Sequence, residues 1–186
     1  MGFHTFDAEK AARLEDAAKR YRYLSREELL EALAPSEDDS IADLGSGTGF
    51  YTDDVAPHVR TVYAVDVQAT MHDAYREKGV PENVELVTSD IEELPFETDQ
   101  LDGAFSTMTY HEFASRDAIA ELERAVRSGG RLAIVDWSAD GSGESGPPTD
   151  ERYAASDATT ALERVGFEIV SERVRPETFV VVARSP

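Results

Sequence analysis

The segment Ile41–Thr52 places the strongest constraint on how this chain folds. A short apolar run ends at Asp43, and glycines follow at every second position, at Gly45, Gly47 and Gly49. Glycine turns sharply and lets the backbone approach a ligand closely, because it has no side chain. Between a strand and a helix, this pattern predicts a tight loop beneath an adenosine-type cofactor.

Strand-like apolar runs and helical stretches alternate along the rest of the chain. The alternation predicts an α/β fold, in which a parallel sheet carries helices on both faces. The last two apolar runs are joined by Arg175–Thr178, which is short enough to favour an antiparallel hairpin. The expected strands are Ile41–Leu44, Thr61–Val67, Val84–Thr88, Leu101–Thr107, Arg131–Trp137, Phe167–Val174 and Phe179–Arg184, and the expected helices are Phe50–Ala56, Ala69–Glu77, Ser115–Arg127, closed by a left-handed turn at Gly129, and Ser156–Val165.

The residues before the first strand are predicted to be helical. Asp7–Arg22 shows the periodicity of an amphipathic helix with a stripe of mostly alanine side chains. Ser25 and Glu28 have the spacing of a capping box, which predicts a second helix that runs to Leu33. With 186 residues we expect one domain, formed by a helical cap, 1–39, and a cofactor-binding core, 40–186.

The composition narrows the classes of partner. The chain has no cysteine, which excludes disulfides, zinc–thiolate sites and thiol catalysis. Its net charge of −20 repels nucleic-acid phosphate and anionic lipid. An acidic surface suits either a basic partner or a cytoplasmic protein of a high-salt organism, and the even spread of the charge favours the second. The charged start is unlike a secretory signal, and no apolar run approaches the ~20 residues of a membrane span, so we expect a cytoplasmic protein without membrane insertion.

Three carboxylates stand where predicted strands end. Asp43 closes the first strand, Asp66 closes the second and Asp90 follows the third. In open α/β sheets ligands bind beyond the carboxyl ends of the strands, so all three are expected along one crevice. Asp66 lies about twenty residues after the glycine loop, where an acidic side chain accepts hydrogen bonds from ribose hydroxyls. A single aspartate at a strand end is more simply explained as a cap of a helix or loop. Three such aspartates together with a glycine loop favour a ligand-binding site.

The glycine loop departs from the dinucleotide fingerprint G-x-G-x-x-G. Its sixth position is Phe50, where NAD enzymes use a third glycine for close helix packing beside the pyrophosphate. A cofactor without phosphates has less use for that arrangement. Asp43 beside the loop also suits a cationic group such as the ammonium of an amino acid.

The ordered set of motifs resembles class I S-adenosylmethionine-dependent methyltransferases. DLGSGTG is similar to their first motif, VYAVDV to the second, SDIEELPF to the third and LDGAFSTMTYHEF to the fourth, while LERAVRSGGRLAIVDW and VGF resemble the segments that follow. The resemblance covers Ser40 to Ala183. It implies a three-layer, Rossmann-like sandwich with a seven-stranded, mostly parallel sheet whose last strand is antiparallel. Within the superfamily the chain looks most similar to the small quinone- and sterol-type enzymes.

The resemblance also implies how S-adenosylmethionine is bound. Asp43 would orient the amino-acid end and Asp66 would hold the ribose hydroxyls. Asp90 would accept from the adenine amino group, and Ile91 would supply a backbone donor. The other implied cofactor residues are the loop residues Gly45, Ser46, Gly47 and Gly49, and Val67 and Met71 against the adenine ring, although Met71 also fits a plain helix core.

The methyl acceptor is expected beside the loop Met108–Phe113. There His111 is a candidate general base, with Tyr110 as a second catalytic candidate; hydrogen bonding to loop backbone is the alternative for His111. A metal site at His111–Glu112 is not expected, because no second histidine has ligand spacing. Tyr23 and Trp137 suit either ligand contact or packing.

The region after the strand that ends at Trp137 is short, since it holds only the flexible Ala139–Asp150 loop before the last helix. This suggests a small acceptor, or an open site completed by a second subunit in a homodimer. Two other functions remain open on the sequence. They are an NAD-type oxidoreductase and a non-catalytic, cofactor-binding partner subunit.

Overall fold

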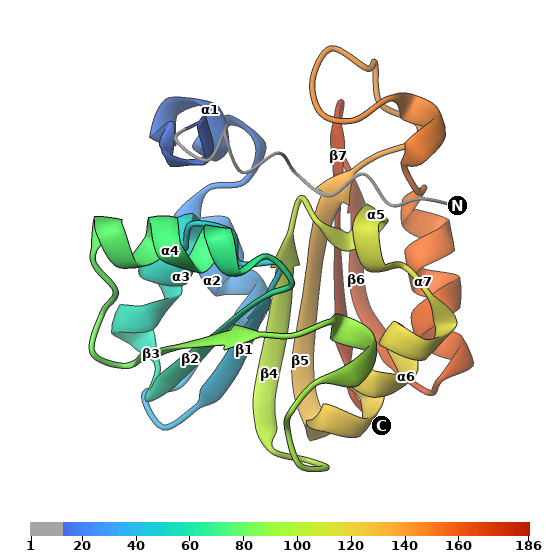
Figure 1. Cartoon of the computed structure of the whole chain (residues 1–186). Helices are drawn as coiled ribbons and strands as arrows, with labels where there is room; N and C mark the ends of the chain where they lie inside the picture. Colours follow the sequence, from blue (N-terminus) through green and yellow to red (C-terminus); the bar gives the residue numbers. More distant parts are fainter. Residues whose placement is uncertain (1–12) are drawn as a thin grey trace.

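A seven-stranded sheet forms the centre of the computed structural model, which describes residues 13–186 (Figure 1). Its strands run in the order β3-β2-β1-β4-β5-β7-β6. β7 is antiparallel to both β5 and β6, and the other neighbouring strands pair in parallel. The strands are β1 (Ser40–Leu44), β2 (Thr61–Asp66), β3 (Val84–Thr88), β4 (Leu101–Thr107), β5 (Val126–Trp137), β6 (Glu168–Val174) and β7 (Thr178–Arg184). The predicted fold class is confirmed, including the antiparallel last strand.

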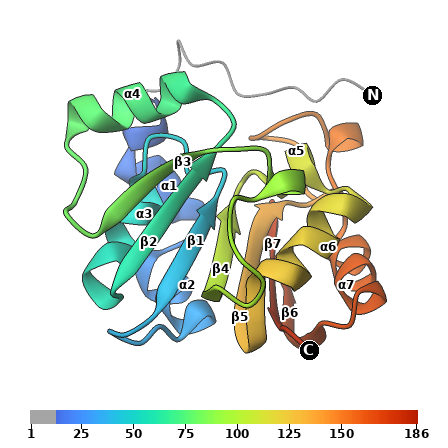
Figure 2. The same ribbon diagram turned by 60° about the horizontal axis from the view of Figure 1, so that its bottom comes forward.

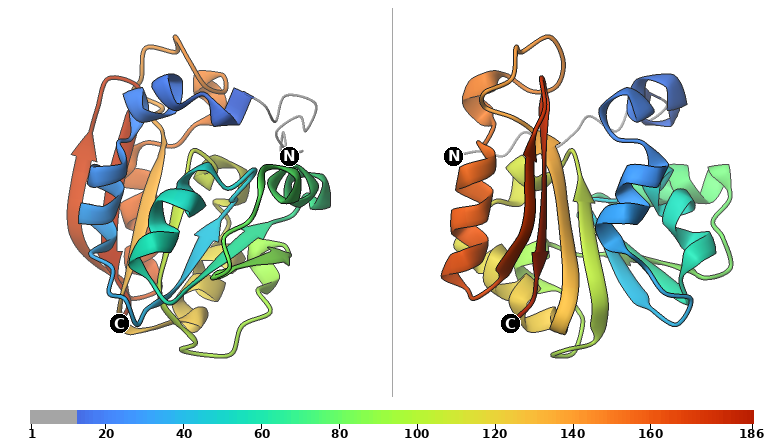
Figure 3. Two further views of the ribbon diagram at one scale, coloured as in Figure 1. Left: turned by 90° about the vertical axis from the view of Figure 1, so that its left-hand side faces the viewer. Right: turned by 180° about the vertical axis from the view of Figure 1, so that it is seen from behind.

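Helices cover both faces of the sheet, so the fold has three layers (Figures 2 and 3). One face packs on α2 (Arg26–Leu33), α3 (Phe50–Val55) and α4 (Ala69–Lys78), and the other on α5 (Tyr110–Phe113), α6 (Arg116–Ala125) and α7 (Ala155–Arg164). Two hydrophobic cores result, one on each side of the sheet. Short 3-10 turns lie at Ala56–His58, Ile91–Glu93 and Thr149–Glu151. None of the helices in the described residues is long and apolar enough to cross a membrane.

Strand register brings the loops of the predicted site together. Leu44 pairs with Val65, and Asp66 pairs with Thr88. The segments that follow β1, β2 and β3 therefore leave the sheet at the same edge, because parallel strands in register end side by side. Asp43 also pairs with Phe105 of β4, which adds the segment after β4 to this edge.

The N-terminal helix differs from its prediction. Helix α1 spans Ala17–Tyr23, with Asp16 as its N-cap, and it buries none of its residues. The predicted apolar stripe of Asp7–Arg22 is therefore wrong for the described part, and residues 7–12 lie outside it. The N-cap of α2 is confirmed, since the hydroxyl of Ser25 accepts from the backbone N–H of Glu28 at 3.2 Å.

The boundary between α6 and β5 was also predicted wrongly. The helix ends at Ala125, and β5 begins at Val126 rather than Arg131. Gly129 does have a left-handed backbone (φ 77°), but it lies inside the strand. Its N–H donates to the carbonyl of Ser185 at 3.0 Å. The segment that was expected to end the helix is therefore part of β5, because it pairs with Ser185, which is distant in the sequence.

Candidate functional site

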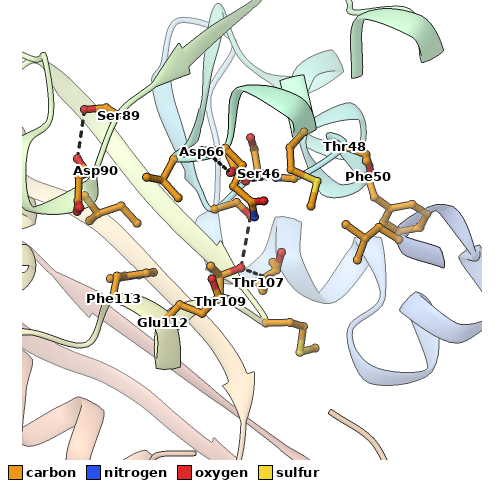
Figure 4. Close-up of a pocket in the computed structure, with 18 of the residues that line it drawn as sticks. Ser46, Thr48, Phe50, Asp66, Ser89, Asp90, Thr107, Thr109, Glu112 and Phe113 are labelled. Atoms are coloured by element: carbon orange, nitrogen blue, oxygen red, sulfur yellow. Dashed lines mark hydrogen bonds between the residues drawn. The ribbon is translucent and has the colours of Figure 1, made fainter. Parts of the chain in front are cut away.

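A pocket of about 310 Å³ opens at the sheet edge where β1, β2 and β4 end. Figure 4 shows Asp66 and Ser46 on one side and Glu112 and Phe113 on the other, with Asp90 at one end and Phe50 at the opposite end. The predicted cofactor residues that line the pocket are Gly45, Ser46, Gly47, Asp66, Val67, Met71, Asp90 and Ile91. The structure thus brings together residues from five separate segments of the chain, 14–20, 45–50, 66–71, 89–92 and 107–113.

The glycine loop takes its shape from two crowded positions. Gly45 has φ 78°, and its N–H donates to the carbonyl of Val65 at 2.9 Å. A Cβ at Gly45 would lie 2.3 Å from Cγ2 of Thr109, and one at Gly49 would lie 2.1 Å from the Tyr75 ring. Both positions combine a left-handed backbone with no room for a side chain. Gly49 lies outside the pocket wall and caps α3, so its role is to let that helix pack closely.

Asp66 joins the glycine loop to the start of α4. Its Oδ2 accepts the backbone N–H of Gly47 at 2.8 Å, and its Oδ1 accepts that of Gln68 at 2.8 Å. Although only 9% exposed, Asp66 still lines the pocket. A carboxylate has about four acceptor positions, so two remain for a ligand after both backbone bonds are made.

Asp43 lies behind the loop and not in the pocket wall. It is 1% exposed, and its Oδ2 accepts the hydroxyl of Thr52 at 2.6 Å. Burial raises the pKa of Asp43 to about 7. Its Oδ1 has no hydrogen-bond partner among the described residues, and neither do the Ser46 hydroxyl and the Arg20 Nε, both from residues of the pocket wall. The expected single row of three carboxylates is therefore wrong for Asp43, because its strand position points it into the protein.

The end of the pocket near Asp90 is partly apolar. Asp90 is exposed and caps the turn Ile91–Glu93, where its Oδ1 accepts the N–H of Glu92 at 3.0 Å. Val67 is 55% exposed, whereas Met71 and Ile91 are buried with only part of their surface toward the pocket. An exposed valine beside a buried methionine offers an apolar surface of the kind that a flat ring covers.

His111 is held against a buried carboxylate at the other side of the pocket. Its backbone N–H donates to Oδ2 of Asp136 at 2.6 Å, and its Nδ1 lies 3.0 Å from the same carboxylate. Asp136 is fully buried at the end of β5. Burial opposes a charge on the His111 ring, but the hydrogen bond to Asp136 and its charge outweigh this and raise the pKa of His111.

Glu112 is the member of this group that lines the pocket. Its carboxylate lies 3.9 Å from Nε2 of His111 and keeps 20% of its surface exposed. Burial raises the pKa of Glu112 to about 7, and the charges of Asp66 and Asp136 act in the same direction. Asp136, His111 and Glu112 thus form a chain of titratable groups that leads from the core to the pocket.

Tyr110, Tyr23 and Trp137 lie outside the pocket wall. Tyr110 is 1% exposed and packs edge-on against Phe113, with ring centroids 5.5 Å apart. The rings of Tyr23 and Trp137 contact each other at 4.8 Å. Both therefore join the N-terminal segment to the region after β5, and the catalytic role of Tyr110 stays a prediction.

Arg20 and Phe50 line the pocket although the sequence did not assign them to it, whereas Met108 belongs to the loop expected beside the acceptor. Arg20 comes from α1, and Phe50 occupies the position that marked the loop as different from a dinucleotide site. Met108 has φ 61°, which is unusual for a residue with a side chain and falls at the turn after β4. No sequence signal places Arg20 here, because its position depends on how α1 packs on α3. Within residues 13–186, no three histidine or acidic side chains gather as a metal site would require.

Comparison with known proteins places the chain in a family. The family model described as a methyltransferase domain matches residues 42–134, half of the chain. An uncharacterized methyltransferase of Mycobacterium bovis is 29% identical over 158 residues, covering 84% of this chain and 60% of the relative. A demethylmenaquinone methyltransferase of Corynebacterium kroppenstedtii is 30% identical over 116 residues, covering 62% and 49%. The chain spans about half the length of the curated relatives that it matches.

Solved structures agree with this assignment. A crystal structure of a SAM-dependent methyltransferase from Aquifex aeolicus superposes with a TM-score of 0.86 at 29% identity, covering 96% of this chain and 98% of the other. The shared fold extends over nearly all of both chains. The chain belongs to the methyltransferase domain family, within the class I S-adenosylmethionine-dependent methyltransferases.

Proposed function

We propose that the chain binds S-adenosylmethionine in this pocket and catalyses transfer of its methyl group to a small-molecule acceptor. The observation that carries the proposal is the pocket itself. Its wall combines a glycine loop, a carboxylate with two acceptor positions left at Asp66, and an apolar surface at Val67. The glycine loop lets the ligand approach closely, the Asp66 carboxylate complements the ribose diol, and the apolar surface complements the base.

The unpaired buried atoms support the fit of this cofactor. Asp43 Oδ1 and Ser46 Oγ have no hydrogen-bond partner within residues 13–186, so a ligand with an ammonium group and further polar atoms would satisfy them. We assign the amino-acid end to the side of Asp43 and the adenine to the side of Asp90, with Ile91 and Met71 packed near the ring. Gly45 and Gly47, which line the pocket, keep the loop close beneath the ligand.

The bound cofactor would supply an electrophilic methyl group on a sulfonium that is already a good leaving group. The chain's own task is then to position the acceptor, exclude water and take up a proton where the acceptor carries one. We assign proton uptake to His111, whose ring is oriented by Asp136 and whose Nε2 faces Glu112. Glu112 completes this path at the pocket surface.

We further propose a small, flat acceptor of the quinone type. A demethylmenaquinone methyltransferase is among the relatives, and apolar side chains of Met108 and Phe113 line the pocket beside Glu112. Such an acceptor has an ionisable hydroxyl in its reduced form, which matches the titratable groups there. The stretch between β5 and α7 is short, which suits a small acceptor or completion by a second subunit.

Calorimetry separates this function from an NAD-type oxidoreductase. Titration with S-adenosylhomocysteine is expected to give one site per chain, and NADH is expected not to bind. The reason is that the pocket offers carboxylates and not a phosphate-binding helix end. The glycine that the dinucleotide fingerprint G-x-G-x-x-G requires at its sixth position is replaced by Phe50. Binding of NADH alone would contradict the proposal. Turnover is then tested with labelled methyl donor and a reduced demethylmenaquinone, and cofactor binding without turnover of any acceptor would favour the partner-subunit function.

We also propose that the acidic surface is an adaptation to a salt-rich cytoplasm. The net charge is −20 and the chain has only three lysines, while acidic residues occur along its whole length. At low ionic strength such a surface repels itself and destabilises the compact state, and salt screens that repulsion.

A further inference from the structure

Arg20 is the only cationic side chain among the described residues that line the pocket. The same wall carries the carboxylates of Asp66, Asp90, Glu92 and Glu112. The net charge of the chain is −20, and the carboxylates of this wall favour cationic ligand groups. Arg20 is the residue of the wall that can pair with an anionic ligand group. It comes from α1, outside the α/β core.

Two aromatic rings contact the guanidinium of Arg20. Its central carbon lies 4.7 Å from the centroid of the Tyr51 ring and 5.5 Å from that of Phe50. The hydroxyl of Tyr51 donates to the carbonyl of Arg20 at 3.1 Å, which fixes α1 against α3 at this residue. Within residues 13–186 the buried Nε has no hydrogen-bond partner. A buried donor of this kind costs stability until an acceptor reaches it.

The position of Arg20 indicates which acceptor that is. Phe50, on which it stacks, lies at the end of the pocket opposite Asp90 (Figure 4). The charge of Asp43, whose Oδ1 lacks a partner, acts on Arg20 from behind the loop. Glu15 also acts on Arg20, but its carboxylate is engaged by Lys78 Nζ at 3.2 Å. Within the described part of the chain, this end of the pocket thus has a guanidinium whose Nε lacks a partner, and behind the loop lies a buried carboxylate oxygen that also lacks one. The two groups match the paired charges of an amino acid.

We propose that Arg20 receives the carboxylate of the amino-acid end of the bound cofactor, an inference that rests on the proposed function. A guanidinium presents N–H donors in a rigid fork that matches a carboxylate. The ammonium of the same end then faces Asp43. Arg20 thereby makes the pocket select nucleosides that carry an amino-acid group over nucleosides that lack its carboxylate.

Calorimetry with two ligands tests this role. One is S-adenosylhomocysteine, and the other is its decarboxylated analogue, which keeps the ammonium and lacks only the carboxylate. Wild-type protein is expected to bind the analogue roughly 10- to 100-fold more weakly. Arg20→Met should weaken S-adenosylhomocysteine binding by a similar factor and leave the analogue within about twofold. Arg20→Lys should restore part of the loss, and Arg22→Met, an exposed position on the same helix, should change neither affinity.

The outcomes separate this proposal from the function on which it rests. Equal losses for both ligands in Arg20→Met would overturn it, because Arg20 would then act only through the shape of the pocket. Equal affinities of the wild-type protein for the two ligands would overturn it without any variant, which decides the question even if Arg20→Met fails to fold. A wild-type protein that binds neither ligand would overturn the proposed function, and this proposal with it.

Discussion

Replacing Asp66 by asparagine tests the site most directly, because the protein itself uses only part of this carboxylate. Backbone N–H groups of Gly47 and Gln68 each donate to it at 2.8 Å. The two remaining acceptor positions are those proposed for the ribose hydroxyls. Asparagine keeps the shape of the side chain, removes its charge and leaves one oxygen in place of two.

The expected loss in affinity follows from these bonds. A hydrogen bond to a charged group contributes about 1.5–3 kcal/mol, and partial compensation by water brings the loss for two bonds to about 2–4 kcal/mol. At about 1.4 kcal/mol for each factor of ten, Asp66→Asn should weaken S-adenosylhomocysteine binding about 30- to 700-fold. Calorimetry measures this, and Asp73→Asn, an exposed position on α4, serves as the matched control with unchanged affinity.

A second ligand distinguishes hydroxyl binding from support of the loop. The 2′-deoxy analogue of S-adenosylhomocysteine lacks one of the proposed partners of Asp66, so it should bind wild-type protein more weakly and lose less on Asp66→Asn. An equal loss for both ligands would refute the assigned role, since the carboxylate would then act only by anchoring Gly47. Unchanged affinity for S-adenosylhomocysteine would refute it as well.

Three further predictions concern stability. Gly49→Ala should lower the free energy of unfolding in urea by about 2–4 kcal/mol, because its Cβ would overlap the Tyr75 ring, whereas Gly79→Ala, with a left-handed backbone but open space, should cost about 1 kcal/mol. The pKa of His111 is raised in the folded protein, so its pairing with Asp136 stabilises the fold fully at pH values below the ordinary pKa of 6.5. That stabilisation is lost as the pH rises through the higher pKa of the folded state. His111→Gln should therefore cost more stability at pH 6 than at pH 9, and a cost that does not vary with pH would count against the pair. The unfolding temperature should rise between 0.1 and about 3 M KCl, and a flat or falling curve would argue against adaptation to salt.

Much of the fold followed from local patterns. The strand bounds were predicted closely because buried parallel strands are continuous apolar runs between turns, as in Thr61–Asp66 and Leu101–Thr107. The two regions predicted wrongly are those in which distant contacts decide the outcome. Gly129 lies in a strand because the C-terminal segment pairs there, and α1 is short because it packs through a few polar and aromatic contacts rather than an apolar stripe.

The candidate site divides in the same way. Residues adjacent in sequence to the ends of strands, such as Asp66 and Asp90, could be placed in the pocket from the motif alone, since strand ends meet at one edge. Arg20, Glu112 and the pairing of His111 with Asp136 depend on the packing of α1 and α5 on the core. Their side-chain directions have no signature in sequence spacing.

The sequence by itself determined the glycine loop at Ile41–Thr52, the alternation that builds the sheet and the family to which the chain belongs. Only the tertiary structure decided which polar atoms remain unpaired at that loop and which charges face them. The physical reason is one of range. Backbone turns and strand periods are set by neighbouring residues, whereas the burial of Asp43, the pKa of Glu112 and the position of Arg20 are set by groups that folding brings together from distant parts of the chain.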